Sequence, residues 1–476
     1  MKKLIRLIQG IAFCALILAA LSFASGILER KESSFKYRPF IEAQEDFDVL
    51  FMGNSHMVNS VFPMELWRDY GIVSYNIAGY GNTVPTSYWA MRNAFDYSQP
   101  RLMVIDISGV SREEKLSGSS GDLHKALDCY PLSLTKIQAI RDLIDDPHAF
   151  DDDGNRYVDM IWEYYLPLGK YHSRWNDLSE SDFYPQYSAE KGAETVVGVA
   201  VPREYQIFEH GYATEEIGWG FVYLRRMIEE CQSRGIDVLL THLPFPSKEY
   251  QQCDANAVRY IAEEYGVPFI DFVYSDYVVD YDTDLYDPSS HLNASGGKKV
   301  TDYLGQYIKN HFDIPDRRED AAYAHWHDDH QDYLERKLAL FRLHSNPANA
   351  LMLMHDNDFA VHLYIPKESR IYDDDTLLLL MHNIAREHVF EEDEFVKYSA
   401  SMYPLETLDK AVQTYEAYYL ISDRSSNSFE EYMAAEAEEA FEAHFGSGQE
   451  PQDMFLQLYD VHSGQLLLTQ SYSVSR

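Results

Sequence analysis

Two short segments, far apart in the chain, carry the residues with the clearest capacity for chemistry. Residues 48–56 (DVLFMGNSH) read as a buried strand that ends and delivers Ser55, and residues 287–293 (DPSSHLN) supply His291 with the acid Asp287 close by. A serine hydroxyl becomes a useful nucleophile when an imidazole accepts its proton and an acidic group orients that imidazole. The two segments together therefore predict an acyl-transfer or ester-cleaving site.

The elements around these residues read as strands that alternate with helices. Alternation with short connections is typical of a parallel sheet covered by helices. We expect five strands, at residues 48–52, 72–77, 102–107, 236–243 and 267–272. The main helices are expected at 63–70, 86–97, 132–144, 215–234, 248–265 and 295–312, with Ser295 as the N-cap of the last.

The topology predicts that the candidate residues meet at one edge of this sheet. In an open parallel sheet, ligands bind at the carboxyl ends of the strands. Ser55 follows the first strand, residues 76–83 follow the second, and residues 287–291 follow the fifth. Glycines in the 76–83 segment let a backbone N–H approach a substrate oxygen. Each segment alone is a weak signal, and their convergence carries the prediction.

With these motifs in place, the chain resembles the SGNH (GDSL-like) hydrolase superfamily. The resemblance covers roughly residues 46–312, interrupted by an insertion at about 109–212, and it implies a three-layer α/β/α fold. The first family block corresponds to residues 53–56, where Asn54 replaces the usual aspartate. The resemblance implies that Ser55 is the nucleophile and that no cofactor or metal takes part.

The family's oxyanion-binding groups are matched only in part. The segment after the second strand resembles the second block and implies Gly81 as the oxyanion glycine, with Gly79 as the alternative. Val110 stands where the third block carries an asparagine. That side-chain donor is therefore absent, or it is supplied by Asn82 or Asn54.

The last block also departs from the family pattern. The resemblance implies His291 as the catalytic base, but Asp287 lies four residues before it rather than three, and Pro288 takes the expected place. We expect Asp287 to reach the histidine through a bulged loop, with Asp284 as the alternative acid.

The first 28 residues read as a membrane anchor. Lys2, Lys3 and Arg6 precede an apolar stretch at 10–28 that is long enough to cross a bilayer. The positive charges predict a cytoplasmic amino terminus and a single-pass protein of the cell membrane, with everything after this stretch outside. A small-residue site at 22–24 leaves a cleaved signal peptide as the alternative.

Charge and composition limit the possible partners. The chain has 476 residues, 40 basic and 77 acidic, with a formal net charge of −37. Such a field repels nucleic acid, so no nucleic-acid partner is expected, and it suits a neutral or cationic substrate. Solubility alone is an equally good explanation of this charge. The four cysteines, at 14, 129, 231 and 253, form neither a disulfide framework nor a metal motif.

The carboxyl-terminal part changes in character. Residues 313–344 read as a charged, solvated helical linker whose histidines do not share one helix face. Residues 345–476 read as a small α+β module without recognisable chemistry. Its strands are expected at 359–365, 417–422, 454–459 and 465–472, and an acidic helix at 429–445.

The membrane anchor and the departures from the family's third and last blocks narrow the resemblance to one group of proteins. The chain is most similar to membrane-anchored SGNH proteins of bacterial surface-polymer modification, such as acetyltransferase-like proteins of exopolysaccharide systems and the D-alanine transfer protein of teichoic acid modification. This resemblance implies acyl transfer, above all O-acetylation, from a membrane-bound O-acyltransferase partner to hydroxyls of a surface polysaccharide or teichoic-acid-like polymer. His172, Arg174 and Trp175 are weaker candidates for substrate binding, or form an ordinary aromatic cluster.

Two other functions fit the same residues. A carbohydrate esterase or deacetylase would use the same site with water as the acceptor. A non-catalytic scaffold for surface polymer is the more distant alternative, which the replaced third-block asparagine keeps open.

Overall fold

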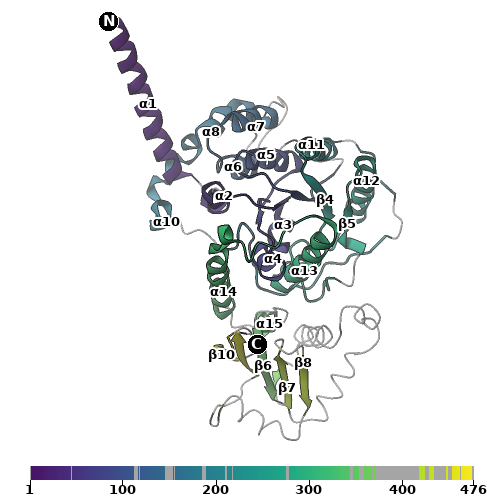
Figure 1. Ribbon diagram of the computed structural model, residues 1–476. Helices are drawn as coiled ribbons and strands as arrows, with labels where there is room; N and C mark the ends of the chain where they lie inside the picture. The colour runs from purple at the N-terminus through teal and green to yellow at the C-terminus, as the bar shows by residue number, and fades with distance from the viewer. Residues whose placement is uncertain are drawn as a thin grey trace.

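Figure 1 shows the computed structural model, in which a parallel-sheet domain is flanked by a long amino-terminal helix and a separate antiparallel sheet. The structure describes residues 2–29, 31–43, 45–111, 116, 118–144, 154, 156–184, 189–208, 212–216, 218–274, 278–343, 347–352, 359–366, 369–370, 417–423, 428–433, 446, 448, 453–460 and 463–473.

The central sheet has five parallel strands in the order β2-β1-β3-β4-β5. All five predicted strands are confirmed, with slightly shorter bounds. They are β1 (Val49–Met52), β2 (Ser74–Asn76), β3 (Leu102–Asp106), β4 (Asp237–His242) and β5 (Phe269–Asp271). The chain leaves β1 toward β2 on one side and later returns to β3 on the other, so the strand order reverses at β1.

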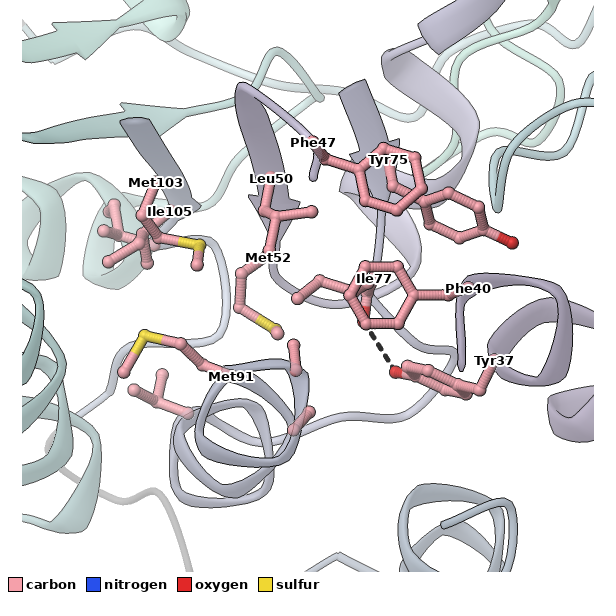
Figure 2. Packing of buried hydrophobic residues seen from close by; sticks show 14 of the residues in the cluster. Tyr37, Phe40, Phe47, Leu50, Met52, Tyr75, Ile77, Met91, Met103 and Ile105 are labelled. Atoms are coloured by element: carbon pink, nitrogen blue, oxygen red, sulfur yellow. Dashed lines mark hydrogen bonds between the residues drawn. The ribbon is translucent and has the colours of Figure 1, made fainter. Parts of the chain in front are cut away.

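Alternating side chains of β1 supply the two hydrophobic layers of the domain. Leu50 and Met52 belong to one core cluster, and Val49 and Phe51 belong to the other. This is the period of two expected for a strand that is buried on both faces. Figure 2 shows the first layer, in which Leu50, Met52 and Met91 belong to the same buried cluster.

Helices cover both faces of the sheet and complete the predicted three-layer α/β/α architecture (Figure 1). The first layer receives α5 (Val84–Ala94), α7 (Leu134–Ile144), α11 (Trp219–Ser233) and α12 (Glu249–Tyr265), and the second receives α3 (Ser55–Ser60), α4 (Pro63–Tyr70) and α13 (Ala294–His311).

The predicted N-cap of α13 is wrong. Asn293 caps this helix, and its side chain accepts a hydrogen bond from the N–H of Gly296 at 3.1 Å. The Ser295 hydroxyl instead donates to buried Asp284 at 3.0 Å. Both residues are good cap formers, so local preference alone could not decide between them.

The insertion after β3 is built from short helices. These are α6 (Ser120–Leu127), α7, η1 (Tyr157–Met160), α8 (Ile161–Tyr165), α9 (Leu168–Tyr171), η2 (His172–Asn176) and α10 (Glu180–Phe183).

The amino-terminal helix α1 (Lys2–Leu28) projects from the body of the molecule (Figure 1). Its span from Lys3 to Leu28 is long and apolar enough to cross a membrane, and almost none of it is buried against the protein. These properties fit a membrane anchor or a signal sequence. A second helix, α2 (Lys31–Ala43), follows, and the hydroxyl of Tyr37 donates to the Ile77 carbonyl at 2.6 Å (Figure 2).

The segment predicted as a solvated linker is instead packed on the domain. Its helix α14 (His325–Leu343) buries Trp326 and Tyr333. The apolar residues of this helix lie among many charged ones but share one buried side. Its overall composition therefore resembles that of a solvated helix.

Fully buried Glu65 of α4 explains part of this packing. Lys337 of α14 lies 2.7 Å from its carboxylate, Tyr333 donates to it at 2.8 Å, and Lys298 of α13 lies 3.9 Å away. Burial raises the pKa of Glu65, but the charges of Lys337, Arg68 and Lys298 outweigh it and hold that pKa well below its usual range.

The carboxyl-terminal strands form an antiparallel sheet in the order β10-β9-β6-β7-β8. The strands are β6 (Phe359–Pro366), β7 (Ala417–Asp423), β8 (Ser428–Met433), β9 (Met454–Asp460) and β10 (Leu466–Tyr472), and the short helix α15 (Pro347–Met352) precedes them. The helix predicted at 429–445 is wrong over its first five residues, because pairing with β7 draws them into β8. Residues 434–445 lie outside the described part of the chain.

Candidate active site

Ser55 stands at the carboxyl end of β1, where the strand order reverses. Asn54 caps α3 by accepting a hydrogen bond from the N–H of His56 at 2.9 Å, so the helix begins at Ser55. Gly53 makes the tight exit from the strand possible, because an added Cβ would lie 2.9 Å from the Cβ of Asp106. The position fits the rule that parallel α/β sheets bind ligands at such reversals.

His291 reaches Ser55 from a short hairpin. Leu285 and Leu292 form an antiparallel bridge, and both are fully buried. The N–H of Tyr286 donates to the His291 carbonyl at 2.8 Å. Because side chains alternate along a strand, Tyr286 and His291 face the side opposite to the two leucines. From there Nε2 of His291 lies 2.8 Å from Oγ of Ser55.

Asp287 is the acid that orients His291. One carboxylate oxygen contacts Nδ1 of His291, and the other accepts hydrogen bonds from the N–H groups of Ser289 at 2.9 Å and Ser290 at 2.8 Å. The backbone turn around the carboxylate accommodates the extra residue in the Asp-to-His spacing. Asp284, the alternative acid, is instead buried and bonded to Lys299 and Ser295.

The surroundings of Asp287 favour its ionised form. Partial burial raises its pKa, but hydrogen bonds from the Ser289 backbone and from His291 outweigh this and lower the pKa below its usual value. The side chains of Asp287 and His291 are 28% and 26% exposed, so substrate can approach them. Ser55, His291 and Asp287 thus have the contacts of a nucleophile, a general base and an orienting acid.

Gly81 is the better placed of the two candidate oxyanion glycines. The N–H of Gly79 donates to the Gly53 carbonyl at 3.2 Å and is therefore engaged. Among the described residues, the N–H groups of Gly81 and Ser55 have no hydrogen-bond acceptor. Two features exclude a side chain at position 81. Gly81 has a φ of +73°, which favours glycine, and a Cβ there would lie 2.6 Å from the Asp122 carboxyl.

Of the residues considered for the missing side-chain oxyanion donor, Asn54 is the one with an uncommitted amide group. Val110 is buried in the core. The Asn82 amide is nearly buried beneath Gly79 and lies 3.5 Å from the Gly53 carbonyl. Asn54 uses its side-chain oxygen as the cap of α3, and its Nδ2 amide group donates to no acceptor among the described residues. The candidate donors are therefore the backbone N–H groups of Ser55 and Gly81 and the Asn54 amide.

Three further side chains beside the triad were not singled out from the sequence. The His56 ring lies 5.7 Å from that of His291, and burial together with the nearby histidines lowers the His56 pKa to about 3, so it is neutral and uncharged at neutral pH. The centroids of the Tyr80 and His291 rings lie 6.4 Å apart. Tyr286 is the cross-strand neighbour of His291 in the hairpin. The only sequence signal was their adjacency to the predicted motifs.

His172, Arg174 and Trp175 lie at the carboxyl end of α1. Arg174 donates to the carbonyl oxygens of Leu28 and Glu29 and pairs with Asp182 at 2.8 Å. His172 contacts the Gly169 carbonyl at 2.8 Å, and Trp175 is exposed. These contacts give no support to the predicted substrate-binding role.

Comparisons with known proteins add little to this geometry. No family model matches the chain, and no curated protein matches it. A solved structure from Bacteroides fragilis, described as a "putative acylhydrolase", is similar with a TM-score of 0.30 and 14% identity, over 59% of this chain and 99% of that one. The fold and the site therefore rest on the chain's own structure.

Proposed function

We propose that this chain is an extracytoplasmic, serine-dependent acyltransferase that moves an acyl group, above all acetyl, onto hydroxyls of a cell-surface polysaccharide or related polymer. The observation that carries the proposal is the connected arrangement of Ser55, His291 and Asp287 at the carboxyl edge of the sheet, with a 2.8 Å contact between Nε2 and Oγ.

In the first half-reaction, Oγ of Ser55 attacks the carbonyl carbon of an acyl donor while Nε2 of His291 takes the hydroxyl proton. Asp287 holds the imidazole and stabilises its positive charge. The N–H groups of Ser55 and Gly81 stabilise the oxyanion. His291 then returns the proton to the leaving group, and the acyl group remains on Ser55 as an ester.

In the second half-reaction, an acceptor hydroxyl enters in place of the leaving group. His291 removes its proton as its oxygen attacks the acyl-serine, and the regenerated Ser55 hydroxyl recovers that proton. Water in the same place would give an esterase or deacetylase. The outcome therefore depends on which hydroxyl occupies the site.

Two tyrosines support a sugar or polyol as the acceptor. Tyr80 is 37% exposed and Tyr286 is 47% exposed, and both lie beside His291. A half-exposed tyrosine offers a flat apolar face for a sugar ring and a hydroxyl for its polar edge. The Tyr80 hydroxyl is also tied to Asn59, which holds the ring in place.

The proposed donor is a membrane-bound O-acyltransferase that delivers the acyl group to the outer side of the membrane. This part rests on the resemblance to surface-polymer modification proteins and on the apolar helix α1. A single-pass anchor with a cytoplasmic amino terminus would keep Ser55 on the same side as the acceptor polymer.

The test uses the purified full-length chain, an activated acetyl ester and an oligosaccharide acceptor. We expect acetylated oligosaccharide and, after rapid acid quenching, an acetyl group on the Ser55 peptide by mass spectrometry. The Ser55→Ala variant should lose both, while Ser233→Ala, a matched change on α11, should retain them.

Other outcomes would change the proposal. Full transfer by Ser55→Ala would contradict every serine-dependent mechanism. Rapid hydrolysis with no acetylated oligosaccharide would favour the esterase. Binding of oligosaccharide without any acyl-serine would favour the scaffold.

A further inference from the structure

The carboxyl-terminal part of α1 packs against three short helices of the insertion, α9, η2 and α10, and α8 packs against α9. We call these four helices (residues 161–184) the collar. The N–H of Leu168 donates to Oγ of Ser25 at 3.0 Å, and Arg174 donates to the carbonyl oxygens of Leu28 and Glu29. Figure 1 shows α8 and α10 near the base of the projecting helix.

The collar carries large aromatic side chains that are at least half exposed. Trp162 is 52% exposed and Trp175 is 67% exposed, and Phe183 and Tyr184 at the end of α10 are 52% and 74% exposed. Exposed apolar side chains that form a contiguous patch mark protein or membrane interaction sites, and the collar supplies four such side chains within 23 residues. Tryptophan and tyrosine are also the residues enriched where a bilayer meets water.

The position of the collar along α1 points to the membrane surface as its partner. Arg6 is the last charged residue before Glu29, so the uncharged stretch begins at Leu7. At about 1.5 Å per residue, Ser25 lies about 27 Å along the helix from Leu7, close to the roughly 30 Å hydrocarbon thickness of a bilayer. A helix that crosses a membrane would therefore reach the headgroup region where the collar first buries it.

We propose that the collar is a membrane-docking surface, in which Trp162, Trp175, Phe183 and Tyr184 insert into the outer interface of the lipid bilayer around the exit of α1. The surface is continuous with the proposed membrane-spanning helix. Together, the embedded helix and the collar fix the tilt of the domain and the height of Ser55 above the membrane, which a single helix followed by a flexible tether would leave free.

Tryptophan fluorescence tests this docking directly. The chain has six tryptophans, and none lies in α1. Trp67, Trp89 and Trp326 are buried, which leaves Trp162, Trp175 and Trp219 exposed. The full-length chain is reconstituted into phosphatidylcholine vesicles in which an acyl chain carries bromine near its headgroup end, because brominated lipid quenches only tryptophans that enter the bilayer.

We expect strong quenching of the wild-type chain, and the Trp162→Phe/Trp175→Phe double variant should lose more than half of it. The matched variant Trp219→Phe, at the start of α11, should lose little. Circular dichroism should show that both variants keep the wild-type fold.

Three results would overturn the proposal. They are a chain that does not float with the vesicles, quenching that survives in the double variant, and aqueous iodide that reaches Trp162 and Trp175 in vesicles as readily as it reaches Trp219. The last would leave the collar open to a protein partner instead. None of these measurements depends on catalysis, so they can fail or succeed independently of the proposed acyl transfer.

Discussion

Two histidine–aspartate pairs of the sheet domain, one at the ends of β4 and β5 and one on the hairpin that carries His291, differ in access. In one, Nδ1 of His242 lies 3.0 Å from Asp271, and the two side chains are 1% and 4% exposed. In the other, Nδ1 of His291 contacts Asp287, and about a quarter of each side chain is exposed. Only His291 has a serine hydroxyl on its second nitrogen.

The difference shows that an acid–imidazole pair is not itself a catalytic device. His242 packs against Phe245 in the interior, where its contact with Asp271 joins neighbouring strands β4 and β5. His291 sits on a hairpin at the rim, where substrate and proton can reach it. The first pair should therefore matter for stability and the second for rate.

The largest effect is expected from His291→Ala. Removing the base should lower kcat/KM for acyl transfer by about 10⁴-fold or more, because triad residues act as a unit. The thermal unfolding midpoint should change little, since the side chain is partly exposed. Steady-state kinetics and calorimetry on the same sample check both parts, and near-normal activity would remove His291 from the mechanism.

The next largest effect is expected from Asp287→Asn. Asparagine keeps the shape but cannot enforce the imidazole tautomer, and a change of this kind costs about 10⁴-fold in rate in a well-studied triad. We expect a loss of about 10³-fold to 10⁴-fold in kcat with KM nearly unchanged. A loss below tenfold would indicate that His291 works without its acid.

His242→Ala should show the opposite division of effects. It leaves the Asp271 carboxylate buried with the half-exposed Arg259, 3.5 Å away, as its charged partner among the described residues. We expect a loss of about 2–4 kcal/mol in unfolding free energy. Activity of the folded fraction should stay within a factor of about two, because His242 does not touch the nucleophile. A loss of activity without a loss of stability would contradict the comparison.

The smallest effect is expected in the pH dependence of folding stability. The Asp287 pKa is lower in the folded chain than in the unfolded one. Its stabilising contribution is therefore complete above the unfolded value of about 3.9 and is lost as the pH falls through the lower folded value. Thermal unfolding between about pH 2 and about pH 5 should show a shallower acid limb for Asp287→Asn than for the wild-type chain, and identical slopes would contradict the assignment.

Much of the sheet domain could be predicted from the sequence because its signals are local. Short apolar runs such as residues 48–52 and 102–107, separated by helical periodicity, give the strands and the edge where they end. The catalytic candidates Ser55 and His291 then follow from topology. The extra residue before His291 was the main uncertainty, and backbone hydrogen bonds around Asp287 resolve it.

What could not be predicted depends on distant partners. The buried side of α14 follows from Glu65, which lies about 270 residues earlier in the chain. Arg174 looked free to bind an anion because nothing near it in sequence reveals that it contacts the end of α1. Residues 429–433 looked helical beside their acidic neighbours, and only pairing with β7 makes them a strand.

The buried carboxylate of Glu65 has a consequence for how the chain is made. Its compensating charges include Lys298 and Lys337, which leave the ribosome long after β1 and α4 have been synthesised. Until then Glu65 would have Arg68, 3.6 Å away on the same helix, as its charged partner, and complete burial without the two lysines would be unfavourable. We therefore expect the early part of the sheet domain to stay incompletely packed until residue 337 is available. A partly folded domain of this kind exposes apolar surface and is a natural client for chaperones that bind unfolded chains.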